Sequence, residues 1–148
     1  MYKKILVAYN GTPESRSALH ECIKIGPPSS TEIHLLVVIQ LSTQGMAGGY
    51  APEGECTTKT QTMEKELAAG RALMAAAGLN VVTHLKMGEP VDVIGALTDQ
   101  LGIELVIVGH SRQKTLAARW WRGSTDALLV ERVKCSILVA AHTSSAGK

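Results

Sequence analysis

IELVIVGHSRQKTLAARWWRGSTDALL, residues 103–129, is the stretch that decides the fold. It opens with the continuous apolar run LVIV, which is typical of a strand buried on both faces of a parallel sheet. Gly109 follows the run, and we expect it to mark the carboxyl end of that strand. After a loop, Gly123-Ser124-Thr125 precedes a new apolar pattern, so Ser124 or Thr125 is expected to cap a helix. The order of strand, loop and capped helix is the repeating unit of an α/β protein.

The loop between the two glycines is basic. It contains no acidic residue, although the formal net charge of the whole chain is only +2. Its positively charged or titratable side chains are His110, Arg112, Lys114, Arg119 and Arg122. Free backbone amides at the start of the following helix form an anion site. Together these features predict a loop that faces phosphate.

Strands and helices alternate along the rest of the chain. Apolar runs predict strands over 5–8, 33–39, 81–86, 105–108 and 137–140. Between them, capping residues, apolar spacing and terminal glycines predict helices that begin at Pro13, Thr58 and Pro90 and end before Gly26, Gly78 and Gly102. The alternation calls for a parallel sheet with helices on both faces, but periodicity gives no strand order.

Several smaller expectations accompany this pattern. Residues 81–86 alternate between apolar and polar, which suits an edge strand. The second helix is expected to turn Met63, Leu67, Met74 and Ala77 inward. Residues 42–59 are rich in glycine and are expected to form a mobile loop, and 142–148 a flexible tail.

Bulk composition favours one soluble globular domain spanning 1–148. The chain is 45% hydrophobic and 19% charged, and a net charge of +2 does not suggest a nucleic-acid binder. No apolar run is long enough to span a membrane, and no cleavable leader is visible. Cys22, Cys56 and Cys135 lack paired spacing, so we expect a cytoplasmic protein with reduced thiols. The five histidines show no spacing typical of a metal site held by protein side chains.

Three segments of the chain resemble the universal stress proteins. The opening segment KKILVAYNGTPESRSAL, residues 3–19, is similar to that family's first strand, turn and helix, with Asn10 where an aspartate is common. Gly109 and Gly123-Ser124 match its phosphate loop, and VKCSILVA, residues 133–140, matches its last strand. The loop departs from the family pattern in two ways: Arg112 stands where a second glycine belongs, and one residue is extra. Residues 42–59 are unmatched.

The resemblance implies a Rossmann-like fold, an open five-stranded parallel sheet with strand order 3-2-1-4-5. In that order the winding reverses between the first and fourth strands, and ligands of such sheets lie beyond the carboxyl ends of the strands at this point. The resemblance also implies adenine and ribose contacts at Ala8, Asn10 and Val38. The phosphate contacts it implies are Gly109, Arg112, Gly123, Ser124 and Thr125.

Two of these residues have competing interpretations. Asn10 keeps an amide that can pair with an adenine edge, but Asn-Gly is also a common turn pair. A glycine in place of Arg112 would let backbone amides approach phosphate. The arginine either supplies a charged fork instead or is a solvated surface residue.

The leading functional prediction is a small stress-response protein that binds ATP or AMP as a sensor or regulatory module, with any Mg²⁺ arriving on the phosphates. One alternative is a scaffold of the same fold that binds no nucleotide. Another is a slow ATP hydrolase, although the chain lacks the glycine-rich Gly-Lys-Ser/Thr loop typical of fast phosphoryl transfer. We expect a homodimer through the last strand, residues 137–141, because an apolar edge is an open template for pairing.

Overall fold

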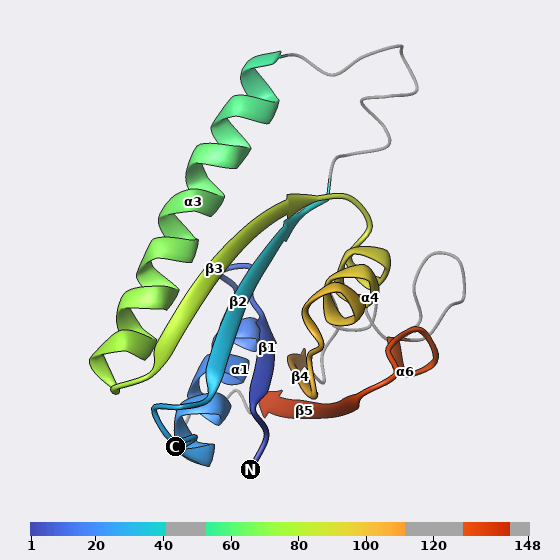
Figure 1. Cartoon of the computed structure of the whole chain (residues 1–148). Coiled ribbons are helices and arrows are strands. Elements are labelled where there is room, and N and C mark those ends of the chain that lie inside the picture. The colour runs from blue at the N-terminus through green and yellow to red at the C-terminus, as the bar shows by residue number, and fades with distance from the viewer. Residues whose placement is uncertain (41–52, 112–128, 143–148) are drawn as a thin grey trace.

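The computed structural model describes residues 1–40, 53–111 and 129–142. They form a five-stranded, wholly parallel sheet with strand order β3-β2-β1-β4-β5, which confirms the predicted topology (Figure 1). The strands are β1 Lys4–Ala8, β2 Glu32–Ile39, β3 Asn80–Met87, β4 Leu105–Ser111 and β5 Ser136–His142. The helices are α1 Pro13–Ile25, α3 Glu53–Ala76, α4 Pro90–Leu101 and α6 Leu129–Arg132.

The helices divide between the two faces of the sheet according to the direction of winding. The connections through α1 and α3 carry the chain from β1 outward to β3, and the connections through α4 and α6 carry it back across to β5. Because parallel crossovers are right-handed, opposite directions place helices on opposite faces. One core therefore joins α1 and α3 to residues such as Val7 and Leu35, and the other joins α4 and α6 to residues such as Leu6 and Leu36.

The predicted helix boundaries are confirmed for α1 and α4. The Oγ1 atom of Thr12 accepts a hydrogen bond from the backbone N–H of Ser15 at 3.2 Å, and Gly26 ends α1 in the left-handed conformation. Glu89 caps α4, and its carboxylate accepts from the N–H of Val91 at 3.0 Å. Local capping chemistry is thus sufficient to place these ends.

Four expectations were wrong. β4 does not end at Gly109 but continues to Ser111, because β5 pairs with it along that length. α3 begins at Glu53 rather than Thr58, so the last seven residues of the expected loop 42–59 are helical. His142 closes β5 and does not belong to a tail. Ala77 is exposed and lies beyond the end of α3 instead of facing the core.

The edge position expected for β3 is confirmed. β3 pairs with β2 along its full length, and no other strand of the described residues borders it. Its side chains are correspondingly open, with Val82 41% exposed. β5 forms the opposite edge. No helix within the described ranges has the length and apolar character needed to cross a membrane.

Candidate functional site

The sheet has a notch at the carboxyl end of its central strand. β1 ends at Ala8, which pairs with Leu36, whereas β2 runs three residues further, through Val37, Val38 and Ile39. On the other side β4 continues from Ile107, the partner of Val7, as far as Ser111. Three extended residues span about 10 Å, so both neighbours project well beyond β1. The notch lies beside the point between β1 and β4 where the winding of the sheet reverses.

Ala8 and Val38 lie on the same side of this notch. Both contribute to the core on the α4 face, where Ala8 is buried and Val38 is half-buried. Val38 stands two residues past the partner of Ala8, so it rises beside the space above the end of β1. Ala8 is only 1% exposed, so Val38 supplies the accessible apolar surface beside the end of β1.

The turn that follows β1 is held by its own side chains. Asn10 Oδ1 accepts hydrogen bonds from the N–H of Thr12 at 3.1 Å and from its hydroxyl at 2.7 Å. The N–H of Asn10 donates to Ser15 Oγ at 3.1 Å, and that hydroxyl donates to the carbonyl of Thr12 at 3.0 Å. A backbone N–H needs an acceptor, which fixes the orientation of the Asn10 amide. These bonds agree with the turn interpretation of Asn10, and none of them uses its NH₂ group.

Gly109 has a structural reason to be glycine. A Cβ atom there would overlap the carbonyl group of Glu14 and would lie 3.1 Å from the Cα of Ser15. The first turn of α1 thus packs directly on the backbone of β4. This contact brings the Asn10 turn and the end of β4 together at the notch, so it positions both walls of the candidate site.

Tyr9 and Glu66 border the notch on the α3 side, and sequence analysis missed both. The Tyr9 side chain is buried, and its hydroxyl donates to Glu66 Oε1 at 3.4 Å. Burial raises the pKa of Tyr9, and Glu66 adds to this, although nearby Arg16 opposes it. The carboxylate of Glu66 also lies against Gly11, where a Cβ would be 2.9 Å from its Cδ. Glu66 belongs to no sequence motif. The only sequence signal for Tyr9 is its position directly after the apolar strand that ends at Ala8.

The structure brings together four of the eight predicted site residues: Ala8, Asn10, Val38 and Gly109 flank the notch. The other four, Arg112, Gly123, Ser124 and Thr125, lie outside the described residues.

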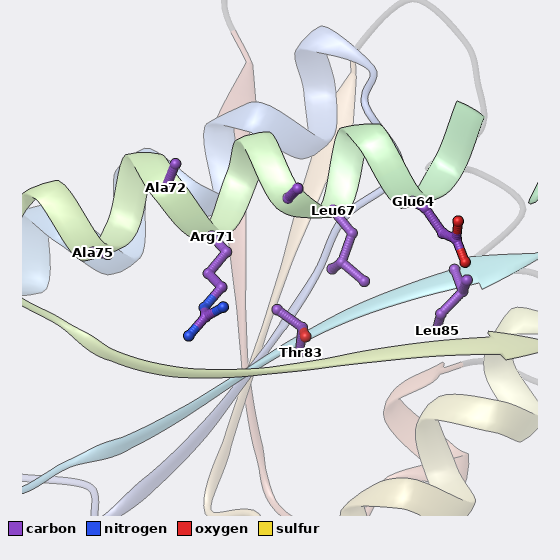
Figure 2. Close-up of a pocket in the computed structure, with 8 residues that line it drawn as sticks. Glu64, Leu67, Arg71, Ala72, Ala75, Thr83 and Leu85 are labelled. Carbon is purple, nitrogen blue, oxygen red and sulfur yellow. The ribbon is translucent and has the colours of Figure 1, made fainter. Parts of the chain in front are cut away.

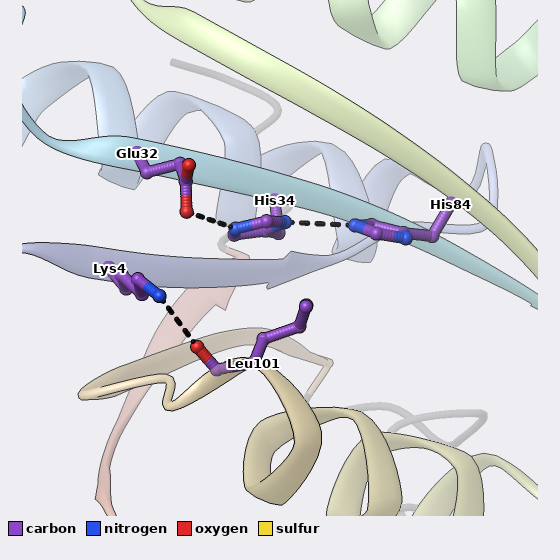
Figure 3. A network of polar contacts seen from close by, with 5 residues as sticks. All are labelled: Lys4, Glu32, His34, His84 and Leu101. Atoms are coloured by element: carbon purple, nitrogen blue, oxygen red, sulfur yellow. Dashed lines mark hydrogen bonds and ion pairs between the residues drawn. The ribbon is translucent and has the colours of Figure 1, made fainter.

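A second polar cluster, the histidine chain, lies on the α4 face of the sheet and was not predicted (Figure 3). Glu32 Oε1 accepts from His34 Nε2 at 2.9 Å, and His34 Nδ1 lies 2.8 Å from His84 Nε2. An ionised carboxylate only accepts, so a neutral His34 accepts in turn from His84. The hydrogen bond from His34 lowers the pKa of Glu32, and desolvation lowers the pKa of His84, with help from His34 and Lys86. Beside the chain, Lys4 Nζ donates to the carbonyl of Leu101 at 2.9 Å.

Neither cluster forms a metal site. No group of three or more His, Cys, Asp or Glu side chains in the described part of the chain is arranged to hold a metal ion. The residues that flank the notch combine the half-buried apolar side chain of Val38 with the polar side chain of Asn10.

The open parallel sheet, its strand order and its helices on both faces are those of Rossmann-like α/β proteins. The model of the universal stress protein family matches residues 1–141, and the chain belongs to this family.

The chain is similar to a universal stress protein of Synechocystis, with 24% identity over 153 residues that cover 95% of this chain and 99% of the relative. A solved universal stress protein family structure from Arabidopsis thaliana, with AMP bound, shares 18% identity and covers 96% of this chain and 93% of its own, with a TM-score of 0.67. A universal stress protein in complex with cAMP shares 20% identity, covers 96% and 98%, and also has a TM-score of 0.67. At these identities the structures establish the fold.

Proposed function

We propose that this protein binds an adenine nucleotide, ATP or AMP, in the notch above β1 and acts as a sensor or regulatory module in a stress response. The observation that carries the proposal is the recessed end of β1 between the longer β2 and β4. The AMP and cAMP complexes of structural neighbours support the choice of ligand.

In this proposal Ala8 and Val38 contact the adenine, and the free NH₂ group of Asn10 donates to a ring nitrogen. Gly109 brings the end of β4 close to the phosphates. The basic loop, with Arg112, Gly123, Ser124 and Thr125, completes the phosphate site, and Mg²⁺ enters with the nucleotide.

Calorimetry with ATP and AMP tests the proposal. We expect micromolar dissociation constants, equivalent to about 8 kcal/mol at 1 μM. The Asn10→Asp variant keeps the bonds to Thr12 and changes the free amide donor into an acceptor, so we expect the ATP affinity to change by about fivefold or more. Asn80→Asp makes the same exchange at an exposed position at the start of β3 and should leave ATP affinity unchanged.

A scaffold that binds no nucleotide is the second candidate, because the Asn10 oxygen is already used within its turn. Absence of heat, together with absence of a thermal shift at millimolar ATP and AMP, would select the scaffold. A ligand at 100 times its dissociation constant stabilises the native state by about 2.7 kcal/mol, which a melting experiment detects readily.

We also propose a cytoplasmic homodimer formed through β5. Ile137, Leu138 and Val139 are only half-buried in this edge strand. A groove of about 500 Å³ is lined by Ile137 and Leu138 together with Met1 and Tyr2. Pairing with a second β5 about a two-fold axis would cover this edge. The free thiols of Cys22 and Cys135 fit a reducing compartment. A mass near 15.7 kDa by light scattering at micromolar concentration would contradict the dimer.

A further inference from the structure

The outer edge of β3 and helix α3 form a groove at the edge of the sheet opposite β5. Its volume is about 610 Å³, and its floor consists of Leu67 from α3 with Thr83 and Leu85 from β3 (Figure 2). On the open side, the backbone of β3 has no strand partner among the described residues. An unpaired strand edge beside an apolar floor is a template for another chain.

The helix side of the groove is shaped for close approach. Ala68, Ala72 and Ala75 line it, and all three are exposed. Small side chains allow a second helix to come nearer than leucine or lysine would permit.

The charged side chains of the groove are complementary to those of a second copy of the chain. Glu64 lies toward the Leu85 end and Arg71 toward the Thr83 end (Figure 2). Both are exposed, and neither forms an ion pair with another described residue. Seven residues of helix separate them by about 10 Å. In an antiparallel pair of such helices, Glu64 of each copy faces Arg71 of the other.

We propose that a second copy of this chain occupies the groove, with the two β3 edges paired antiparallel and the two α3 helices packed antiparallel about one two-fold axis. The axis passes beside Ala68, near the midpoint of Glu64 and Arg71, and beside residue 84, the midpoint of Thr83 and Leu85. Because α3 runs opposite to β3 and covers this segment, a single axis serves both pairs (Figure 1).

The spacing of the layers agrees with this arrangement. α3 packs on both β2 and β3, so its axis lies about half a strand spacing inside the edge. Two strands pair at about 4.8 Å, which places the two α3 axes roughly 10 Å apart. Packed helices lie 8–10 Å apart, and alanines at the contact suit the lower part of that range. Strand pairing and helix packing can therefore form together without distortion of either.

A charge exchange tests the proposal by sedimentation velocity. Glu64→Arg alone and Arg71→Glu alone each place like charges across the axis twice, and each should weaken association at this edge about tenfold or more. The double variant Glu64→Arg/Arg71→Glu restores both pairs and should recover the wild-type mass. An equimolar mixture of the two single variants should also recover it, because the mixed pair is complementary.

Lys65→Glu is the matched control, since it reverses an exposed charge on α3 outside the groove and should leave the mass unchanged. Circular dichroism and thermal melting of each variant establish that it is folded. The predicted fall in mass arises at the β3 edge alone, because the variants leave the β5 edge unchanged. The proposal is overturned by a wild-type mass that neither single variant reduces, or by single variants that do not recover it when mixed. The first outcome would leave the groove to a different occupant, such as an extended segment of another protein.

Discussion

The Asn10 turn and the histidine chain are both polar clusters in the same sheet, but they are built in opposite ways. In the turn, the hydrogen bonds among Asn10, Thr12 and Ser15 join residues no more than five apart in sequence. In the histidine chain, His34 and His84 are 50 residues apart and meet because β2 and β3 pair in a particular register. The first cluster can form before the fold does, whereas the second exists only after the sheet is assembled.

This difference determines which property a substitution in each cluster should change. The turn belongs to α1 and to the candidate nucleotide site, so damage there should displace the helix start and the notch together. The histidine chain lies under the β2–β3 half of the sheet, so damage there should loosen strand pairing and leave the notch intact. Substitutions in the two regions should therefore separate stability from ligand binding.

The largest effect is expected from Gly109→Ala. The added methyl group overlaps the carbonyl of Glu14, so β4 or the first turn of α1 must move. We expect a loss of about 3 kcal/mol in the free energy of unfolding, measured by urea denaturation, together with loss of nucleotide binding.

Gly78→Ala is its control. Gly78 has φ of 86° but no atom within 4 Å of the added methyl group, so only the backbone strain of about 1 kcal/mol should appear. Equal losses in the two variants would show that the contact with Glu14 has no energetic role.

A smaller effect is expected from His34→Ala. The side chain is 5% exposed, and its removal leaves a cavity and unpairs both Glu32 and His84. We expect a loss of about 2 kcal/mol in the free energy of unfolding with unchanged ATP affinity, whereas His20→Ala, on an exposed part of α1, should cost less than about 0.5 kcal/mol. A fall in ATP affinity for folded His34→Ala protein would contradict the separation of the two regions.

The smallest effect is the pH dependence of the histidine chain. Desolvation holds the pKa of native His84 below 6.5, so the unfolded chain binds this proton first as the pH falls. His84 therefore contributes stability that is present above about pH 6.5 and is lost as the pH falls toward its native pKa. His84→Gln keeps a donor toward His34 but does not titrate, so its stability should fall less between pH 7 and pH 5 in urea denaturation. An identical decline in both proteins would rule out this contribution.

The same contrast explains how much of the molecule could be predicted. The helix starts at Pro13 and Pro90 were correct because caps and fixed proline geometry act within a few residues. The site residues near the Asn10 turn came from the family resemblance, and their part in ligand binding stays a prediction. Strand order came from the family resemblance, since periodicity along one strand carries no information about its neighbours.

The wrong predictions and the missed residues have the opposite cause, because they depend on contacts between residues that are far apart in the sequence. Gly109 was taken as the end of a strand because the apolar run stops there, but here it admits the backbone of α1, a contact nearly 100 residues away in sequence. Glu66 and the histidine chain were missed because they depend on helix packing and on register across 50 residues or more. Such contacts leave no local pattern to detect.

Because the sheet is open, one molecule has two edges at which another copy can pair. β3 and β5 lie at opposite edges. A chain that pairs with itself at both edges is a bifunctional monomer, and its assembly resembles step-growth polymerisation, in which every product retains two reactive ends. Alternating two-fold contacts would then yield filaments with a continuous, twisting sheet, and their mean length would rise with protein concentration. At a given protein concentration, the weaker edge would determine that length.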